Sequence, residues 1–233
     1  MRRTRFAVLV FPGTNCEGDV LHAIRTVIRQ DAELVWHKEG SLDGFDAAVV
    51  PGGFAHGDYL RAGSLARFSP VMTPLAEMAA SGRAVVGICN GFQILQEAGL
   101  LPGAMLRNRS LTYVCRDVWL RAEDRSSPLT AALDEGEVLR IPVGHAEGNF
   151  HVSDAALAAL EDRGQVLFRY CDAAGRASGA ANPNGSRNHI AGVRNERGNV
   201  AALMPHPDRA YEPALGGTDG VRLFESLARW NAS

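Results

Sequence analysis

The amino-acid sequence predicts a doubly wound α/β fold in which a mostly parallel open sheet is extended by antiparallel strands. In the first half of the chain, short apolar runs without polar alternation are separated by longer stretches of helical spacing. From Leu111 onward the pattern changes to strands without intervening crossover helices. Because no repeat, low-complexity tract or linker interrupts the sequence, we expect one domain over residues 1–233.

Apolar runs in the first half predict the buried strands of a parallel sheet, at Arg5–Phe11, Glu33–His37, Asp46–Val50 and Ala84–Ile88. A strand that is covered on both faces does not alternate between apolar and polar residues, and these runs do not alternate. Two intervening segments, Asp19–Arg29 and Ser64–Ala80, carry apolar residues at three- and four-residue intervals. This spacing predicts the helices that connect parallel strands.

The second half predicts further strands, at Thr112–Leu120, Gln165–Tyr170, His189–Arg194 and Asn199–Met204. The last two flank the turn-rich segment 195–198 and therefore predict a hairpin. Gly220–Asn231 has an apolar stripe at helical spacing and predicts a closing helix.

Composition excludes several classes of function. The chain has 24 basic and 26 acidic residues, a net charge of -2, which gives no electrostatic basis for binding nucleic acid or an anionic membrane. The N-terminal apolar run, Phe6–Phe11, is too short for a signal peptide or a membrane span. We therefore expect a cytoplasmic protein that binds neither nucleic acid nor membrane.

The cysteines are far apart and form no CxxC pair, at Cys16, Cys89, Cys115 and Cys171. Neither a disulfide framework nor a zinc site is expected from this spacing, and no HExxH motif is present. Each cysteine is expected to be a buried thiol unless its surroundings indicate chemistry.

The surroundings of Cys89 do indicate chemistry. The buried strand runs into Gly87-Ile88-Cys89-Asn90-Gly91, and helical spacing follows. This is the thiol form of the G-x-S-x-G nucleophile elbow, in which a sharp strand-to-helix turn exposes the nucleophile and requires small flanking residues. A helix N-terminus also favours a negatively charged sulfur. The turn aims the Asn90 backbone N–H at an oxyanion on the attacked carbonyl.

A second motif, Pro51-Gly52-Gly53-Phe54, follows the strand that precedes the elbow strand. Ligands bind at the carboxyl ends of strands in open α/β sheets, and glycines there let backbone amides face the ligand. An oxyanion hole needs more than one donor, and Gly53 can supply the N–H that complements Asn90. Gly52 is expected to face the substrate.

A third motif, Met204-Pro205-His206-Pro207-Asp208, supplies a base for the cysteine and an acid to orient that base. Residues two apart in an extended segment face the same side, so Asp208 can reach one nitrogen of His206. A second His-x-acid pair, His145 and Glu147, competes for this role.

These segments, PGGF (51–54), GICNGFQ (87–93) and MPHPD (204–208), in this order resemble the class I glutamine amidotransferases. The resemblance implies a flavodoxin-like fold and a Cys-His-acid triad that hydrolyses glutamine to glutamate and ammonia. It implies that Cys89 is the nucleophile, His206 the base and Asp208 the orienting acid. Aspartate is one methylene shorter than the usual glutamate of the family, which predicts a backbone shift or a looser contact with His206.

Further segments narrow the resemblance to a branch of that family whose members serve purine biosynthesis: PGGFAHGDYLRAG (51–63), CNGFQIL (89–95), NRSLTYVCR (108–116), HAEGNF (145–150), FRYCD (168–172), NPNGS (182–186) and GGTDG (216–220). It implies a separate large ATP- and magnesium-dependent synthetase subunit and a small accessory subunit as partners, with no cofactor on this chain. The synthetase is expected on its own polypeptide because this chain starts at its first strand. The synthetase would use the ammonia to convert formylglycinamide ribonucleotide to formylglycinamidine ribonucleotide.

The resemblance also implies that Gln93, Asn108 and Ser110 help to hold glutamine. Two other functions remain open at this point. The chain can be a stand-alone cysteine hydrolase or peptidase on a similar scaffold, or a non-catalytic regulatory subunit that keeps the elbow for structure alone. Glutamine-protectable alkylation of Cys89 distinguishes the last of these from an enzyme.

Overall fold

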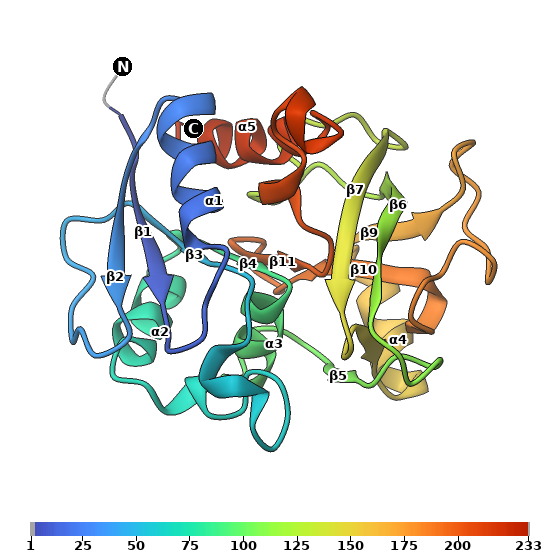
Figure 1. The fold of residues 1–233 in the computed structure, drawn as a ribbon, viewed down its shortest axis with the longest axis horizontal. Helices are drawn as coiled ribbons and strands as arrows, with labels where there is room; N and C mark the ends of the chain where they lie inside the picture. The colour runs from blue at the N-terminus through green and yellow to red at the C-terminus, as the bar shows by residue number, and fades with distance from the viewer. Residues whose placement is uncertain (1–2, 233) are drawn as a thin grey trace.

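A computed structural model describes residues 3–232 and contains one nine-stranded mixed sheet, in the order β2-β1-β3-β4-β11-β10-β9-β6-β7 (Figure 1). The predicted α/β class with parallel and antiparallel strands is confirmed. No helix in this part of the chain has the length and apolar character that crossing a membrane requires.

The parallel half of the sheet comprises β1 (Arg5–Val10), β2 (Asp31–Trp36), β3 (Ala47–Val50), β4 (Ala84–Ile88) and β11 (Val200–Leu203). The three central strands β3, β4 and β11 are buried at every residue, which explains why their sequences do not alternate. The strand order reverses direction at β1 and β3, and the carboxyl ends of the central strands meet at one edge of the sheet.

The antiparallel half comprises β10 (Ile190–Arg194), β9 (Val166–Cys171), β6 (Val114–Ala122) and β7 (Val138–His145). The predicted hairpin is confirmed as the antiparallel pair β10–β11. A separate two-stranded sheet pairs β5 (Ala104–Leu106) with β8 (Asn149–His151).

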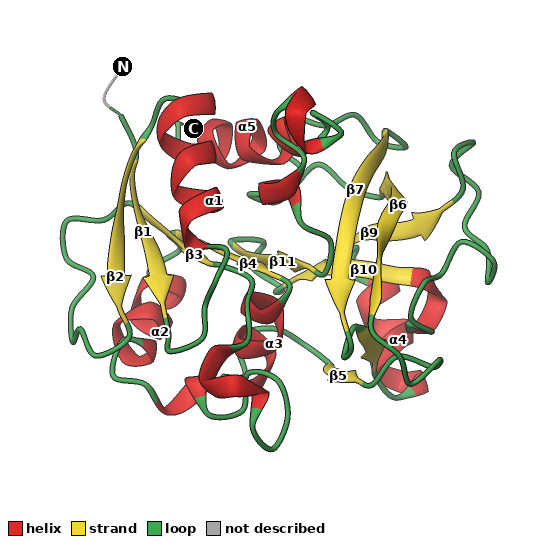
Figure 2. Ribbon diagram, in the orientation of Figure 1, coloured by secondary structure: helices red, strands yellow, loops and turns green. Residues whose placement is uncertain are grey.

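Helices cover both faces of the parallel strands. In Figures 1 and 2, α1 (Glu17–His22) and α5 (Gly220–Trp230) lie on one side, and α2 (Met72–Ala80) and α3 (Asn90–Glu97) lie on the other. The chain continues from α1 through a π-helical turn, Ala23–Val27. Short 3-10 turns occupy Ala55–Asp58, Ala66–Phe68, Arg187–His189, Pro207–Arg209 and Pro213–Leu215.

Two sequence-based expectations about helices differ from the structure. The helix expected over Ser64–Ala80 begins only at Met72, because Pro70 disfavours helical backbone at the preceding residue and Ser69 is extended at ψ 142°. The expectation that no helix lies between the strands of the second half was wrong. Helix α4 (Asp154–Asp162) precedes β9, and its N-cap Ser153 accepts a hydrogen bond from the Ala156 N–H.

Candidate active site

A cavity of about 190 Å³ opens at the carboxyl ends of β3, β4 and β11. This is smaller than the roughly 300–1,000 Å³ of sites for drug-sized ligands, and it suits a small metabolite. Its lining includes Asn15, Cys16, Gly53, Cys89, His206 and Arg209. The structure therefore brings together all three motifs that the sequence singled out.

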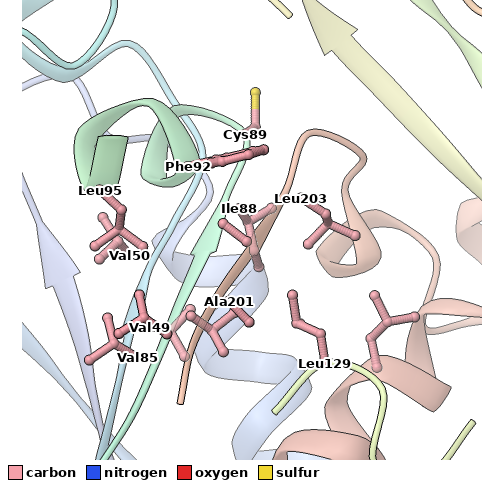
Figure 3. Close-up of a cluster of buried hydrophobic side chains, with 14 of the residues drawn as sticks. Val49, Val50, Val85, Ile88, Cys89, Phe92, Leu95, Leu129, Ala201 and Leu203 are labelled. Carbon is pink, nitrogen blue, oxygen red and sulfur yellow. The ribbon is translucent and has the colours of Figure 1, made fainter. Parts of the chain in front are cut away.

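Cys89 lies on the turn between β4 and α3, and Figure 3 shows its sulfur pointing away from the packed apolar side chains below it. Its backbone has φ 50° and ψ −105°, a left-handed conformation that costs a non-glycine residue roughly 1–3 kcal/mol. The Cys89 N–H donates to the Leu203 carbonyl at 2.9 Å, which ties the turn to β11. The predicted strained elbow is therefore present in the backbone.

The glycines that flank Cys89 are required by close packing of backbone. A Cβ at Gly91 would lie 1.9 Å from the Val50 carbonyl oxygen, and a Cβ at Gly87 would lie 2.8 Å from the Gly91 carbonyl carbon. Helix α3 thus rests directly on the end of β3. This contact fixes the nucleophile relative to the neighbouring strand.

The two backbone N–H groups predicted to stabilise an oxyanion belong to Gly53, which lines the cavity with Cys89, and to Asn90, which follows Cys89 in the chain. Gly53 has φ 144°, and a Cβ there would lie 2.7 Å from the Asn15 nitrogen, so this position also needs glycine. Asn90 is the first residue of α3, where the N–H has no partner within the helix. Within residues 3–232, neither N–H is taken up by a backbone hydrogen bond. Both remain available to an oxyanion.

The Asn90 side chain anchors the loop that follows Gly53. Its Oδ1 accepts from the Ala55 N–H at 2.9 Å, and its Nδ2 donates to Asp58 Oδ1 at 3.1 Å and to Gln93 Oε1 at 2.9 Å. Burial raises the pKa of Asp58, the hydrogen bond from Asn90 opposes this rise and the negative charge of Glu147 adds to it, which together give a pKa of about 6. An ionised carboxylate therefore lies in unfavourable surroundings beneath this loop.

Replacing Asp58 with asparagine is expected to raise the melting temperature at pH 8 and to leave it unchanged at pH 4. The folded chain holds the Asp58 proton more tightly than the unfolded chain, so the natural protein loses stability as pH rises from about 4 to about 6. Asparagine keeps the acceptor for Asn90 and removes this loss. Thermal unfolding across the pH range measures the difference. The exposed Asp43→Asn is the control, and an equal shift in both variants would contradict the assignment.

His206 and Asp208 are both buried, at 6% and 0% exposure, and His206 lines the cavity with Cys89. The backbone N–H of His206 donates to the Pro142 carbonyl at 2.8 Å, which fixes the backbone at this position. His206 Nδ1 lies 3.3 Å from each carboxylate oxygen of Asp208. Burial disfavours the charged imidazole, but the negative charge of Asp208, Cys89 and a hydrogen bond with Cys16 raise its pKa well above the usual value.

Cys16 is a cavity residue that the sequence motifs did not single out. Its sulfur donates to Asn15 Oδ1 at 3.2 Å and accepts from Arg209 Nη2 at 3.2 Å. Its Sγ, a ring nitrogen of His206 and a carboxylate oxygen of Asp208 lie within 4.8 Å of one another. A signal was present in the sequence, because Cys16 follows the first parallel strand at the edge of the sheet where ligands bind.

The competing base, His145, lies outside the cavity lining. Burial lowers its pKa to about 4, so it is neutral at physiological pH. Its Nε2 lies 3.4 Å from Asn184 Nδ2, and the Glu147 carboxylate accepts from the Ala62 N–H at 3.2 Å. Of the two candidate pairs, the structure brings His206 and Asp208 to the cysteine.

The predicted substrate-binding side chains are not among the cavity-lining residues. Gln93 Nε2 donates to the Glu147 carbonyl at 2.6 Å, and Asn108 Nδ2 donates to the carbonyls of Thr112 and His145, both at 2.9 Å. Ser110 is exposed and pairs with Thr112. Gln93 and Asn108 support the loops around the cavity, and a direct contact of any of the three with glutamine stays a prediction.

Gly52 also lies outside the lining, and it packs against the triad instead. A Cβ at this position would lie 2.6 Å from His206 Cε1 and 3.3 Å from Cys16 Sγ. Glycine here lets the imidazole approach the β3 backbone. Its predicted contact with substrate stays a prediction.

Comparison with known proteins extends the likeness over nearly the whole chain. Residues 3–230 match the family model of the CobB/CobQ-like glutamine amidotransferase domain. Phosphoribosylformylglycinamidine synthase subunit PurQ of Thermomicrobium roseum is 56% identical over 223 residues, which are 96% of this chain and 94% of that protein. Subunit PurQ of Gloeobacter violaceus is 53% identical and covers 96% of each chain.

Solved structures show the same relationship. A chain of PurLQS from Thermotoga maritima superposes with a TM-score of 0.86 at 38% identity, covering 98% of this chain and 99% of that one. The glutaminase domain of Trypanosoma brucei CTPS, solved with bound acivicin, has a TM-score of 0.61 at 13% identity, covering 97% of this chain and 94% of that one. The second likeness shows the fold alone.

Proposed function

The chain belongs to the family of CobB/CobQ-like glutamine amidotransferases, and from that premise we propose that it is the glutaminase subunit of a phosphoribosylformylglycinamidine synthase. The observation that carries this function is a single cavity that holds an elbow cysteine and a histidine paired with a buried carboxylate. Relatives of that name match over nearly the full length of the chain.

The reaction begins when the Cys89 sulfur attacks the side-chain amide carbon of glutamine. The oxyanion that forms on the amide oxygen is stabilised by the N–H groups of Gly53 and Asn90, whose removal one at a time costs roughly 10²–10³ in rate in such sites. The tetrahedral intermediate collapses when the amide nitrogen leaves as ammonia, and imidazolium His206 supplies the proton it needs. A γ-glutamyl thioester of Cys89 remains.

Water then releases glutamate. Neutral His206 removes a proton from a water molecule as its oxygen attacks the thioester carbonyl, and the same N–H groups stabilise the second oxyanion. The C–S bond breaks, glutamate departs and the imidazolium–thiolate pair is restored. Asp208 holds the imidazole in one orientation and favours its charged form through both steps.

The ammonia is the product that matters to the assembly. Its acceptor is formylglycinamide ribonucleotide, bound on a large synthetase subunit that uses ATP and Mg²⁺, and a small accessory subunit completes the complex. The solved assembly named PurLQS supports these partners. We place the complex in the cytoplasm, in keeping with the free thiols of Cys16, Cys89, Cys115 and Cys171.

A coupled assay tests the proposal. Glutamate release is measured for the purified chain alone and with the large subunit, the small subunit, ATP, Mg²⁺ and formylglycinamide ribonucleotide. We expect slow release by the chain alone and strong stimulation in the full mixture. Equal rates under both conditions would indicate a stand-alone hydrolase, and no glutamate from a verified complex would indicate a regulatory subunit.

A further inference from the structure

The contact between His206 and its carboxylate is long. Nδ1 is 3.3 Å from both oxygens of Asp208, whereas hydrogen bonds between charged nitrogen and carboxylate measure roughly 2.7–2.9 Å. Only Asp208 Oδ2 makes the hydrogen bond, and Oδ1 is buried without a hydrogen-bond partner among residues 3–232. Asp208 alone therefore fixes the orientation of the imidazole ring only weakly, although both residues are buried.

A second polar atom lies near the imidazole, because Cys16 Sγ, a ring nitrogen of His206 and a carboxylate oxygen of Asp208 lie within 4.8 Å of one another. Measured from an ideal Cβ built at Gly52, Cys16 Sγ and His206 Nδ1 both lie at 3.3 Å. The Cys16 N–H donates to the Gly52 carbonyl at 3.3 Å, so the cysteine backbone is held by the same residue against which the imidazole packs. Sulfur and imidazole nitrogen are thus placed by one backbone segment.

The hydrogen bonds of the sulfur leave it able to accept from the histidine. Cys16 is 2% exposed, its thiol donates to Asn15 Oδ1, and Arg209 Nη2 donates to the sulfur at 3.2 Å. Asp19 lies 3.6 Å from the same guanidinium nitrogen and holds the arginine in place. The sulfur has two lone pairs, so the hydrogen bond from Arg209 leaves one of them for the Nδ1 proton.

The same cluster does not suit a metal ion. Sγ, an imidazole nitrogen and a carboxylate oxygen lie within 4.8 Å of one another, but the Arg209 cation is 3.2 Å from the sulfur and repels a dication. Orientation of the imidazole is the role that fits both the distances and the charge.

We propose that Cys16 is a positioning residue for the catalytic base, its sulfur accepting from His206 Nδ1–H beside Asp208 while Arg209 holds the sulfur in place. This inference rests on the proposed function, because the base acts in glutamine hydrolysis. Cys16, from the loop after β1, thereby supports the three residues of the triad.

A double-mutant cycle tests the role in the full complex. Cys16→Ala is expected to lower kcat on the order of 10-fold at unchanged KM, since it removes orientation and not substrate contacts. In an Asp208→Glu background the longer acid reaches Nδ1, so the same substitution is expected to cost roughly twofold or less. Equal losses in both backgrounds, or no loss in the natural background, would overturn the proposal.

Two matched variants separate orientation from packing. Cys16→Ser keeps an acceptor for Nδ1–H and a partner for Arg209, so it is expected to retain more activity than Cys16→Ala. Cys171→Ala removes another thiol with 2% exposure, in β9 and outside the cavity, and is expected to keep full kcat. If Cys16→Ser is the worse of the two Cys16 variants, the sulfur only fills space and the proposal fails.

A titration that needs no turnover separates the positioning role of Cys16 from the proposed glutaminase function. The His206 ring signal in an NMR titration, assigned with His206→Ala, is expected to show a lower pKa in Cys16→Ala, because an acceptor that favours imidazolium is gone. An unchanged pKa would overturn the positioning role even in an active enzyme. A lowered pKa in a chain that releases no glutamate would support it while rejecting the glutaminase assignment.

Discussion

Cys89→Ala is expected to abolish glutamate release from glutamine and to leave ammonia-dependent synthesis by the assembled complex intact. The sulfur is the atom that forms the thioester, and Cys89 is the cavity thiol that the elbow presents beside His206. Loss of a nucleophile from a triad costs on the order of 10⁴-fold or more in rate. Glutamate release with glutamine, and product formation with ammonium chloride, are the paired measurements.

The control for this variant is Cys171→Ala, which removes a buried thiol that does not line the cavity and is expected to keep both activities. Circular dichroism and co-purification with the large subunit check that Cys89→Ala still folds and assembles. Most of the natural glutaminase rate in Cys89→Ala would reject the covalent mechanism. Loss of the ammonia-dependent activity as well would show that the substitution disturbs the complex.

Local patterns predicted the parts of the fold whose causes are local. The strands β3 and β4 are buried on both faces, and burial on both faces requires the continuous apolar runs seen in their sequences. The elbow was predictable because its glycines are needed by steric contacts within one strand–turn–helix unit and its neighbouring strand. The hairpin of β10 and β11 was predictable from its turn, since a short connection fixes antiparallel pairing.

Features that depend on partners distant in the sequence were not predictable in this way. The apolar residues of helix α4 are two leucines and four alanines, and it has Leu160 fully buried and Ala156 and Leu157 partly buried against the core. Cys16 and Arg209 are 193 positions apart in the sequence, and no local pattern around either residue predicts their contact. Asn108 reads as a polar loop residue, but three hydrogen bonds make it a fully buried brace between the loops.

Gly91→Ala is expected to destabilise the fold by about 3 kcal/mol or more and to abolish glutaminase activity in any protein that remains folded. The added Cβ would lie 1.9 Å from the Val50 carbonyl oxygen, which is backbone and cannot rotate away. Val50 pairs with Gly87 in the sheet, so relief requires α3 to lift from β3. That movement carries the Cys89 sulfur and the Asn90 N–H out of register with Gly53.

Gly18→Ala is the matched control, because Gly18 is likewise the second residue of its helix, α1, and a Cβ there meets nothing within 4 Å. Alanine is expected to stabilise that helix by up to about 1 kcal/mol through the lower conformational entropy of the unfolded chain. Urea unfolding of both variants gives the two free energies of unfolding. If both alanines change stability alike, the effect at Gly91 is helix propensity and not the contact with β3. Opposite signs would establish that the catalytic elbow is held by direct backbone packing between the strand end and the helix.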